Sequence, residues 1–282
     1  MTLRFNMLLA AEGIAPADVR LLRHQKVETR VRTPYSLWRD DPAAFERYQS
    51  MQHASARRRA IFAAPYWASF VVTPDGETLF VGLYQVARIG PAEPDAINPL
   101  TGEPASSAAH PVAYDRYDCR LARPLSAYIG RLFIRWGDGM RSWVQRADNQ
   151  DKEIVALARE FQEPDFPGFS RFIRPLSEIE TMPPSWKAVL TASRGVYLLA
   201  CPRTREHYVG SAYGADGFLG RWRAYVANSH GGNVGLRIRD PSDYVVSVLE
   251  VAGSATTAEE IIALEGLWKM KLLSRDMGLN RN

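Results

Sequence analysis

The chain has 282 residues, of which 46% are hydrophobic and 23% charged, which is typical of a globular protein, and its length favours two domains over one. A net charge of +4 permits a nucleic-acid partner without requiring one, and two distant cysteines exclude both a disulfide framework and a zinc site of paired cysteines. The first apolar run is broken by Glu12 and no run of 18 apolar residues exists, so we expect no signal peptide, no transmembrane helix and no membrane partner, and the cysteine usage favours a cytoplasmic location.

Residues 1–180 are predicted to form a β-rich domain that begins with helices. Apolar residues at helical spacing predict two short helices within 1–24, and a polar helix is predicted over 45–61. Runs rich in β-branched and aromatic residues then predict strands over 66–90, 114–121, 128–137 and 141–147. Turn residues at 74–76 and 137–139 predict a hairpin at each place.

The chain changes character after a predicted helix near 151–161, and we place the domain boundary near residue 180. The elements predicted beyond it are a helix from 184, strands over 195–201 and 207–212, a helix over 216–228, a strand over 244–251 and a helix after Thr257. Thr257 and Glu260 have the spacing of a capping box, which fixes the start of the last helix. Residues 181–282 are therefore predicted to be a separate α+β domain.

Six short elements of this domain resemble the GIY-YIG nuclease family. Gly195-Val196-Tyr197 and Tyr208-Val209-Gly210 match its two name-giving motifs, at a spacing that suits a hairpin. The other matches, in chain order, are Arg221, Tyr225, Glu265 and Asn280. One tripeptide alone is a weak signal, whereas six elements in the family's order are a specific one. The resemblance covers roughly residues 186–282, a third of the chain, and implies a three-stranded antiparallel sheet with flanking helices and a metal-dependent endonuclease acting on DNA.

Glu265 is the expected metal ligand. It shares a helix face with the apolar residues Ile261, Ile262 and Trp268, and a lone carboxylate on such a stripe is costly unless it is paired or bound to metal. Helix spacing alone favours an exposed edge of the stripe or an ion pair with Arg221. With the rest of the family pattern present, we expect a hard divalent cation with water ligands, Mg²⁺ or Mn²⁺.

Tyr197 and Tyr208 are expected on neighbouring strands. Each alone is more often a half-buried sheet tyrosine, but a pair of phenols in a nuclease site can orient and deprotonate a water molecule. The resemblance implies that one of them is the general base, and Tyr197 is favoured. Arg221, four residues before Tyr225, is suited to bind a scissile phosphate, although a surface arginine is the ordinary alternative.

The remaining candidates lie in a glycine-rich segment and at the C-terminal end. Residues 228–239 carry Asn233, Arg237 and Arg239, which fit phosphate contacts in DNA as well as they fit a flexible loop. His230 is an additional catalytic candidate by family resemblance, and Asn280 would support the site by hydrogen bonding.

The first domain is expected to supply target recognition. Its aromatic residues are Trp38, Tyr66, Trp67, Tyr84, Trp136 and Trp143. They would suit a barrel that reads a flipped or modified base, although tryptophans in β domains are usually core residues. The basic run Arg57-Arg58-Arg59 could contact phosphate or form a solvated helix face.

The overall prediction is a DNA endonuclease with a restriction, defence or modified-DNA role. A homodimer is expected if both strands are cut, because one such centre cuts one strand. The alternatives are a DNA repair nuclease, a catalytically silent DNA-binding or repair-accessory protein, and an interaction protein whose aromatic half binds a small ligand or peptide.

Overall fold

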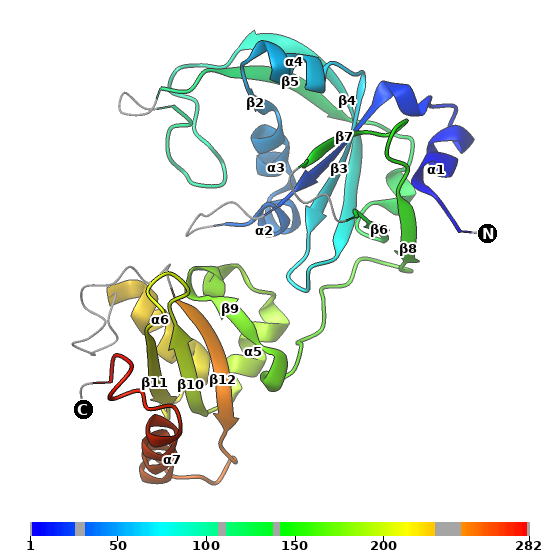
Figure 1. Ribbon diagram of the computed structural model, residues 1–282. Helices are drawn as coiled ribbons and strands as arrows, with labels where there is room; N and C mark the ends of the chain where they lie inside the picture. Colours follow the sequence, from blue (N-terminus) through cyan, green and yellow to red (C-terminus); the bar gives the residue numbers. More distant parts are fainter. Residues whose placement is uncertain (1, 26–31, 107–110, 138–141, 229–243, 281–282) are drawn as a thin grey trace. The chain divides into compact units, whose positions relative to one another are not determined.

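The chain folds into two compact units, Met1–Pro164 and Asp165–Asn282. Figure 1 shows the computed structural model, which describes residues 2–25, 32–106, 111–137, 142–228 and 244–280. The predicted boundary near residue 180 lies inside the second unit, because Phe172, Leu176 and Ile179 are buried in the core of that unit. Within the described ranges, every helix is too short or too polar to cross a membrane.

The first unit is built on an eight-stranded sheet. Its strands are β1 (Val19–His24), β2 (Met51–His53), β3 (Tyr66–Val72), β4 (Thr78–Pro91), β5 (Tyr114–Leu121), β6 (Leu132–Arg135), β7 (Val144–Arg146) and β8 (Glu153–Leu157). Six of them follow the order β2-β5-β4-β3-β1-β7, while β6 pairs with β4 and β8. The helices are α1 (Phe5–Ala11), α2 (Pro34–Asp40), α3 (Pro42–Gln49) and α4 (Ala56–Phe62). The β-rich prediction with helices near the start is therefore correct for this unit.

Three local predictions in the first unit are wrong. The second helix predicted within 1–24 is β1, which pairs in parallel with β3 and buries residues on both faces, so its apolar spacing did not distinguish strand from helix. The single helix predicted over 45–61 is interrupted by β2. The helix predicted near 151–161 is β8, paired with β6.

One predicted hairpin of this unit forms and the other does not. β3 and β4 pair around the turn at 74–76, where the Gly76 N–H donates to Thr73 O at 2.9 Å. The strands on either side of 137–139 do not pair with each other, because β6 pairs with β4 and β8 whereas β7 pairs with β1. Residues 138–141 lie outside the described part of the chain.

The second unit contains a four-stranded antiparallel sheet in the order β11-β10-β12-β9. Its strands are β9 (Ile173–Pro175), β10 (Gly195–Ala200), β11 (His207–Ala212) and β12 (Val245–Val251), and its helices are α5 (Pro184–Ala192), α6 (Gly217–Asn228) and α7 (Ala258–Lys271). The three expected strands are present, and β9 adds a fourth that the short sequence Ile173–Pro175 did not indicate. Figure 1 shows β10, β11 and β12 side by side, with α6 and α7 beside them.

The core of the second unit joins the sheet to α5 and α6. Trp186 of α5, Phe218 and Trp222 of α6, and Tyr197 of β10 are all fully buried in one cluster. The ring planes of Phe172 and Trp222 are stacked with centres 5.5 Å apart. This aromatic packing fixes α6 against the sheet and therefore fixes the polar residues of α6 near β10 and β11.

Candidate active site

Gly210 makes room for two tyrosines on adjacent strands. It lies directly opposite Tyr197 in the β10–β11 register. A methyl group at position 210 would come within 2.6 Å of Tyr197 Cζ and 2.8 Å of Tyr208 Cε1. The glycine of the second tripeptide therefore lets the Tyr197 ring cross β11 and approach Tyr208, which lies one same-face position along the strand.

Four of the seven residues predicted to be catalytic are in contact with one another. The hydroxyls of Tyr197 and Tyr225 lie 2.7 Å apart, and Arg221 Nε donates to the Tyr197 hydroxyl at 3.3 Å. The Arg221 guanidinium also lies over the Tyr225 ring, 5.1 Å from its centre. The Tyr208 ring centre is 6.3 Å from that of Tyr225. The structure therefore brings together Tyr197, Tyr208, Arg221 and Tyr225 from two strands and one helix.

Burial dominates the electrostatics of the three phenols. It raises the pKa of Tyr197 well above its usual range, and Arg221 acts in the opposite direction. Burial also raises the pKa of Tyr208, to which Tyr225 and the negative charge of Glu265 add. For Tyr225, burial and Tyr197 raise the pKa. All three phenols are therefore neutral at pH 7. The positive charge of Arg221 is the neighbouring group that favours ionisation of a tyrosine.

Arg221 and Arg223 are two residues apart on α6 but have different surroundings. Arg223 is exposed and makes a bidentate ion pair with Glu180, at 2.7 and 3.0 Å. Arg221 is half-buried, and among the described residues its partners are tyrosines and none is a carboxylate. Burial lowers the pKa of Arg221, but the neighbouring Tyr197 and Tyr225 raise it overall, so it stays charged. A half-buried cation without an anionic partner is suited to bind an anion from outside.

Glu265 lies near this cluster on α7, and both of its oxygens are engaged. Lys269 Nζ lies 2.7 Å from Oε1, with side chains only 6% (Lys269) and 12% (Glu265) exposed. The Ser211 hydroxyl donates a short hydrogen bond to Oε2. The ion pair expected as one alternative for Glu265 is therefore with Lys269, and in the described part of the chain it does not involve Arg221.

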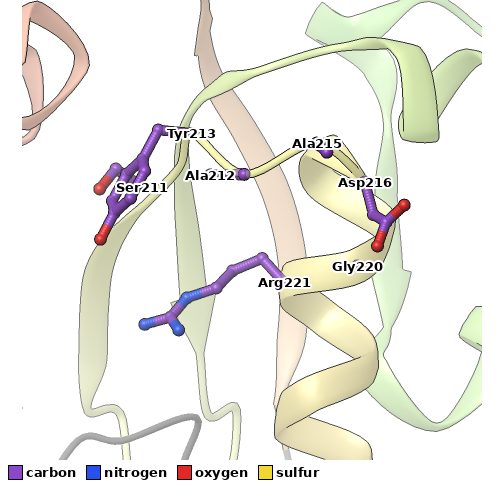
Figure 2. A pocket seen from close by; sticks show the side chains of 9 residues that line it. Ser211, Ala212, Tyr213, Ala215, Asp216, Gly220 and Arg221 are labelled. Carbon is purple, nitrogen blue, oxygen red and sulfur yellow. The ribbon is translucent and has the colours of Figure 1, made fainter. Parts of the chain in front are cut away.

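An open cavity of about 250 Å³ lies where β11 meets α6. Its walls include Ser211, Tyr213 and Gly214 at and after the end of β11, Asp216 just before α6, and Arg221 in the second turn of α6. Figure 2 shows Arg221 extending from α6 towards the strand that carries Ser211, whereas Asp216 points away from it. The cavity thus gives outside molecules access to the side of the cluster that carries the Arg221 guanidinium.

Comparisons with known proteins give one partial similarity. No family model matches the chain, and no curated protein matches it. Among solved structures, a point mutant of the "catalytic domain of intron endonuclease I-TevI" is similar to part of the chain, with 22% sequence identity and a TM-score of 0.28. The similarity covers 32% of this chain and 94% of that one.

The residues around Glu265 can accommodate a hard divalent cation on one condition. Within the described ranges, no three His, Cys, Asp or Glu side chains gather as a metal cluster. Mg²⁺ does not need such a cluster, since it commonly binds through one or two carboxylates, waters and substrate phosphate. Glu265 and the Ser211 hydroxyl supply oxygen donors of the right kind, but Lys269 must release Oε1 before a cation can bind there.

Asn280 bonds to the backbone of β11 and is not part of the phenol–arginine cluster. Its side-chain Oδ1 accepts from the Val209 N–H at 2.9 Å, and its Nδ2 donates to Val209 O at 2.8 Å. The neighbouring Leu279 N–H donates to His207 O. The last described residues are thereby tied to the free edge of β11, next to Tyr208.

The predicted phosphate-contacting segment lies largely beyond the described part of α6. His230, Asn233, Arg237 and Arg239 lie outside the described residues, which stop at 228 and resume at 244. Ser211 and Lys269, which hold the two oxygens of Glu265, were not among the predicted site residues. The Glu265–Lys269 spacing of four on a predicted helix was the available signal for the second.

Proposed function

We propose that residues 165–282 form a GIY-YIG-type nuclease centre that hydrolyses phosphodiester bonds in DNA. The observation that carries the proposal is Arg221, a half-buried cation beside three phenols and an open cavity, with no carboxylate partner in the described chain. A scissile phosphate is the anion that would satisfy it. The order of the six family-like elements supports the same chemistry.

In this mechanism Arg221 binds non-bridging oxygens of the phosphate. Its guanidinium offers paired N–H donors and compensates the charge that develops on the phosphoryl group during attack by water. The cation–π contact and the hydrogen bond to Tyr197 hold the guanidinium at a fixed place, so that little reorganisation is needed when the phosphate arrives.

A tyrosine would accept the proton of the attacking water. Tyr197 is favoured, because it receives the hydrogen bond from Arg221 and its phenolate would lie next to a permanent cation. Tyr225 shares a hydrogen bond with Tyr197 and would orient it. Tyr208, whose pKa is also raised by Glu265, would remain neutral and help to position the water.

Glu265 and Ser211 would hold a divalent cation, Mg²⁺ or Mn²⁺. When bound, such an ion supplies positive charge beside the phosphate and lowers the barrier to loss of the leaving oxygen. Asn280 keeps β11, and with it Tyr208 and Ser211, in place.

Residues 1–164 would serve as the targeting domain, in a restriction, defence or modified-DNA role, and cutting of both strands would involve a homodimer. A catalytically silent DNA-binding or repair-accessory protein is the alternative function, and the raised pKa values of the buried phenols are the observation that favours it.

Cleavage of a mixed pool of unmodified and modified DNA separates the two functions. The full chain with Mg²⁺ is expected to cut at least one member of the pool, while Glu265→Ala does not. A wild-type protein that binds the pool and leaves all of it intact supports the silent alternative. A Glu265→Ala variant that cuts like wild type rejects the metal assignment.

A further inference from the structure

A second cavity, in the first unit, is lined by basic and aromatic side chains. It measures about 520 Å³, within the usual range for ligand pockets. Arg57, Arg58 and His53 contribute nitrogen groups to its wall, and Trp143 contributes an indole ring. No aspartate or glutamate is among the described residues that line it.

The arginine run at 57–59 divides into two kinds of residue. Arg59 bonds to buried Asp115, with its Nε 2.5 Å from one carboxylate oxygen, and Arg88 bonds to the same carboxylate at 2.6 Å. Both carboxylate oxygens of Asp115 are therefore bonded to arginines. Arg57 and Arg58, on the cavity side of α4, have no ion pair within the described chain. Arg59 therefore has a structural role. Arg57 and Arg58 are the members of the run that remain available to contact a phosphate.

Trp143 packs against two buried aromatic rings and is itself only partly buried. Its ring lies 5.8 Å from the ring of buried Phe62 and 5.8 Å from that of His24. Trp67 and Tyr84, two other aromatics of this unit, are buried in contrast. A fixed indole that lines a cavity offers a flat surface on which a base can stack, a contact that contributes about 1–3 kcal/mol per base.

We propose that this cavity binds one unstacked nucleotide of DNA, with its base on Trp143 and its adjoining phosphates on Arg57 and Arg58. The inference rests on the targeting role proposed above for residues 1–164 and names the site that performs it. A nucleotide inside a duplex must leave the stack to reach Trp143, and an unpaired nucleotide does so at lower cost. The site therefore favours DNA that contains an unpaired or easily extruded nucleotide.

Equilibrium binding of the full chain in EDTA tests this inference without any cleavage. Two labelled duplexes are compared by fluorescence anisotropy over a series of salt concentrations, one fully paired and one with a single unpaired nucleotide. Wild type is expected to bind the second duplex about tenfold more tightly, as one stacked base predicts. Because cleavage is absent, failure here is separate from failure of the nuclease centre.

Two variants and one control assign the contacts. Arg57→Gln/Arg58→Gln is expected to weaken binding of both duplexes at least tenfold and to reduce the slope of log K against log salt by about two, since two phosphate contacts are lost. Trp143→Leu is expected to abolish the preference for the unpaired nucleotide and leave the salt slope unchanged. Arg120→Gln, which alters an arginine 79% exposed and paired with Asp118, is expected to behave as wild type.

Three results would overturn the inference. One is equal binding by the double arginine variant and Arg120→Gln; another is a wild-type protein with no preference for the unpaired nucleotide. The third is displacement of the duplex by free dAMP at the concentration at which unlabelled duplex displaces it, which would make the site one for free nucleotides. Thermal melting checks that each variant is folded, and Trp143→Met, which fills space against Phe62 without a ring on which a base can stack, replaces Trp143→Leu if the latter melts early.

Discussion

Lys269 Nζ lies 2.7 Å from Glu265 Oε1, one turn along α7, and both side chains are largely buried. The lysine thus lies beside the carboxylate oxygen at which the proposed metal ion would bind. The Ser211 hydroxyl holds the other oxygen. This arrangement stabilises the buried Glu265 carboxylate without a metal ion. A metal ion that binds Glu265 would have to displace the Lys269 ammonium group.

Lys269→Met should therefore tighten metal binding. The bond from Lys269 to the Glu265 carboxylate is a hydrogen bond between charged groups, worth about 1.5–3 kcal/mol, and a bound metal ion must break it. Its removal predicts an affinity for Mn²⁺ at least about tenfold higher than in wild type. The free Mn²⁺ signal in electron paramagnetic resonance measures this affinity. The variant should also melt at lower temperature in EDTA, because the buried Glu265 carboxylate then lacks its cation, and recover with Mn²⁺. Lys271→Met, on the same helix beside Trp268, is the control. Unchanged Mn²⁺ affinity in Lys269→Met would remove Glu265 as the ligand.

Gly210→Ala should damage the site through packing. The added methyl would lie 2.6 Å from Tyr197 Cζ, so the phenol ring must move, at a cost of about 1–3 kcal/mol in unfolding free energy and with loss of the Tyr197–Arg221 contact. Chemical denaturation and DNA cleavage measure the two effects. At Gly266, next to Glu265 on α7, a methyl group meets nothing within 4 Å. Gly266→Ala should stabilise the helix by about 1 kcal/mol and retain cleavage. Equal cleavage by both variants would argue against the Tyr197 placement.

Cleavage should accelerate with rising pH. Burial raises the pKa of Tyr197, so the phenolate is the minor form at neutral pH and its fraction grows tenfold per pH unit below that pKa. The single-turnover rate should rise with a slope near one between about pH 6.5 and 9. Tyr197→Phe should lower the rate and flatten this profile. If Tyr208→Phe flattens it instead, the base is Tyr208.

Asp115 should make the first unit sensitive to acid. Hydrogen bonds from Arg88 and Arg59 hold the pKa of Asp115 well below its usual range. A carboxyl group whose pKa is lower in the folded than in the unfolded protein stabilises the fold at pH values above its unfolded pKa, about 3.9. That stabilisation is lost as the pH falls towards the folded pKa. Asp115→Asn should cost about 1–3 kcal/mol at pH 7, and the difference from wild type should shrink below about pH 4.

The control for this prediction is Asp118→Asn. Asp118 is 41% exposed and pairs with an exposed arginine, so the change should stay within about 0.5 kcal/mol of wild type. Urea unfolding at several pH values measures both variants. An Asp115→Asn variant as stable as Asp118→Asn at pH 7 would show that the two arginines are satisfied by water.

The order of elements in the second unit was predictable because each has a local signal. Short, largely apolar runs on either side of the turn at 202–206 mark β10 and β11, an aromatic stripe marks α6, and the Thr257–Glu260 capping box forms as predicted at the start of α7. The approach of Arg221 to Tyr197 was an expectation from the resemblance to GIY-YIG nucleases, and the two side chains do meet. The fourth strand β9 was not predictable, because three residues with an exposed Ile173 carry no pattern.

The ion pair of Glu265 with Lys269 could not be predicted from the order of helices and strands, because it depends on how the side chains pack. Lys269 lies four residues after Glu265, a spacing that occurs on many solvated helices, and only the tertiary structure buries the pair. In the first unit, β1 was mistaken for a helix because Val19, Leu21 and Leu22 are all buried, which breaks the alternation that marks a strand. Pairing with β3 and β7, which lie far along the chain, decides its structure.

The central claim is that Arg221 binds the phosphate that is cleaved, and a comparison of two neighbouring arginines tests it most directly. Cleavage of a DNA substrate that wild type cuts in Mg²⁺ is measured under single-turnover conditions for Arg221→Ala and Arg223→Ala. Removal of one preorganised charged contact to the reacting group predicts a rate at least about 10²–10³-fold lower for Arg221→Ala. Arg223→Ala, which removes only the exposed pair with Glu180, should cut like wild type. Equal rates for the two variants would contradict the account.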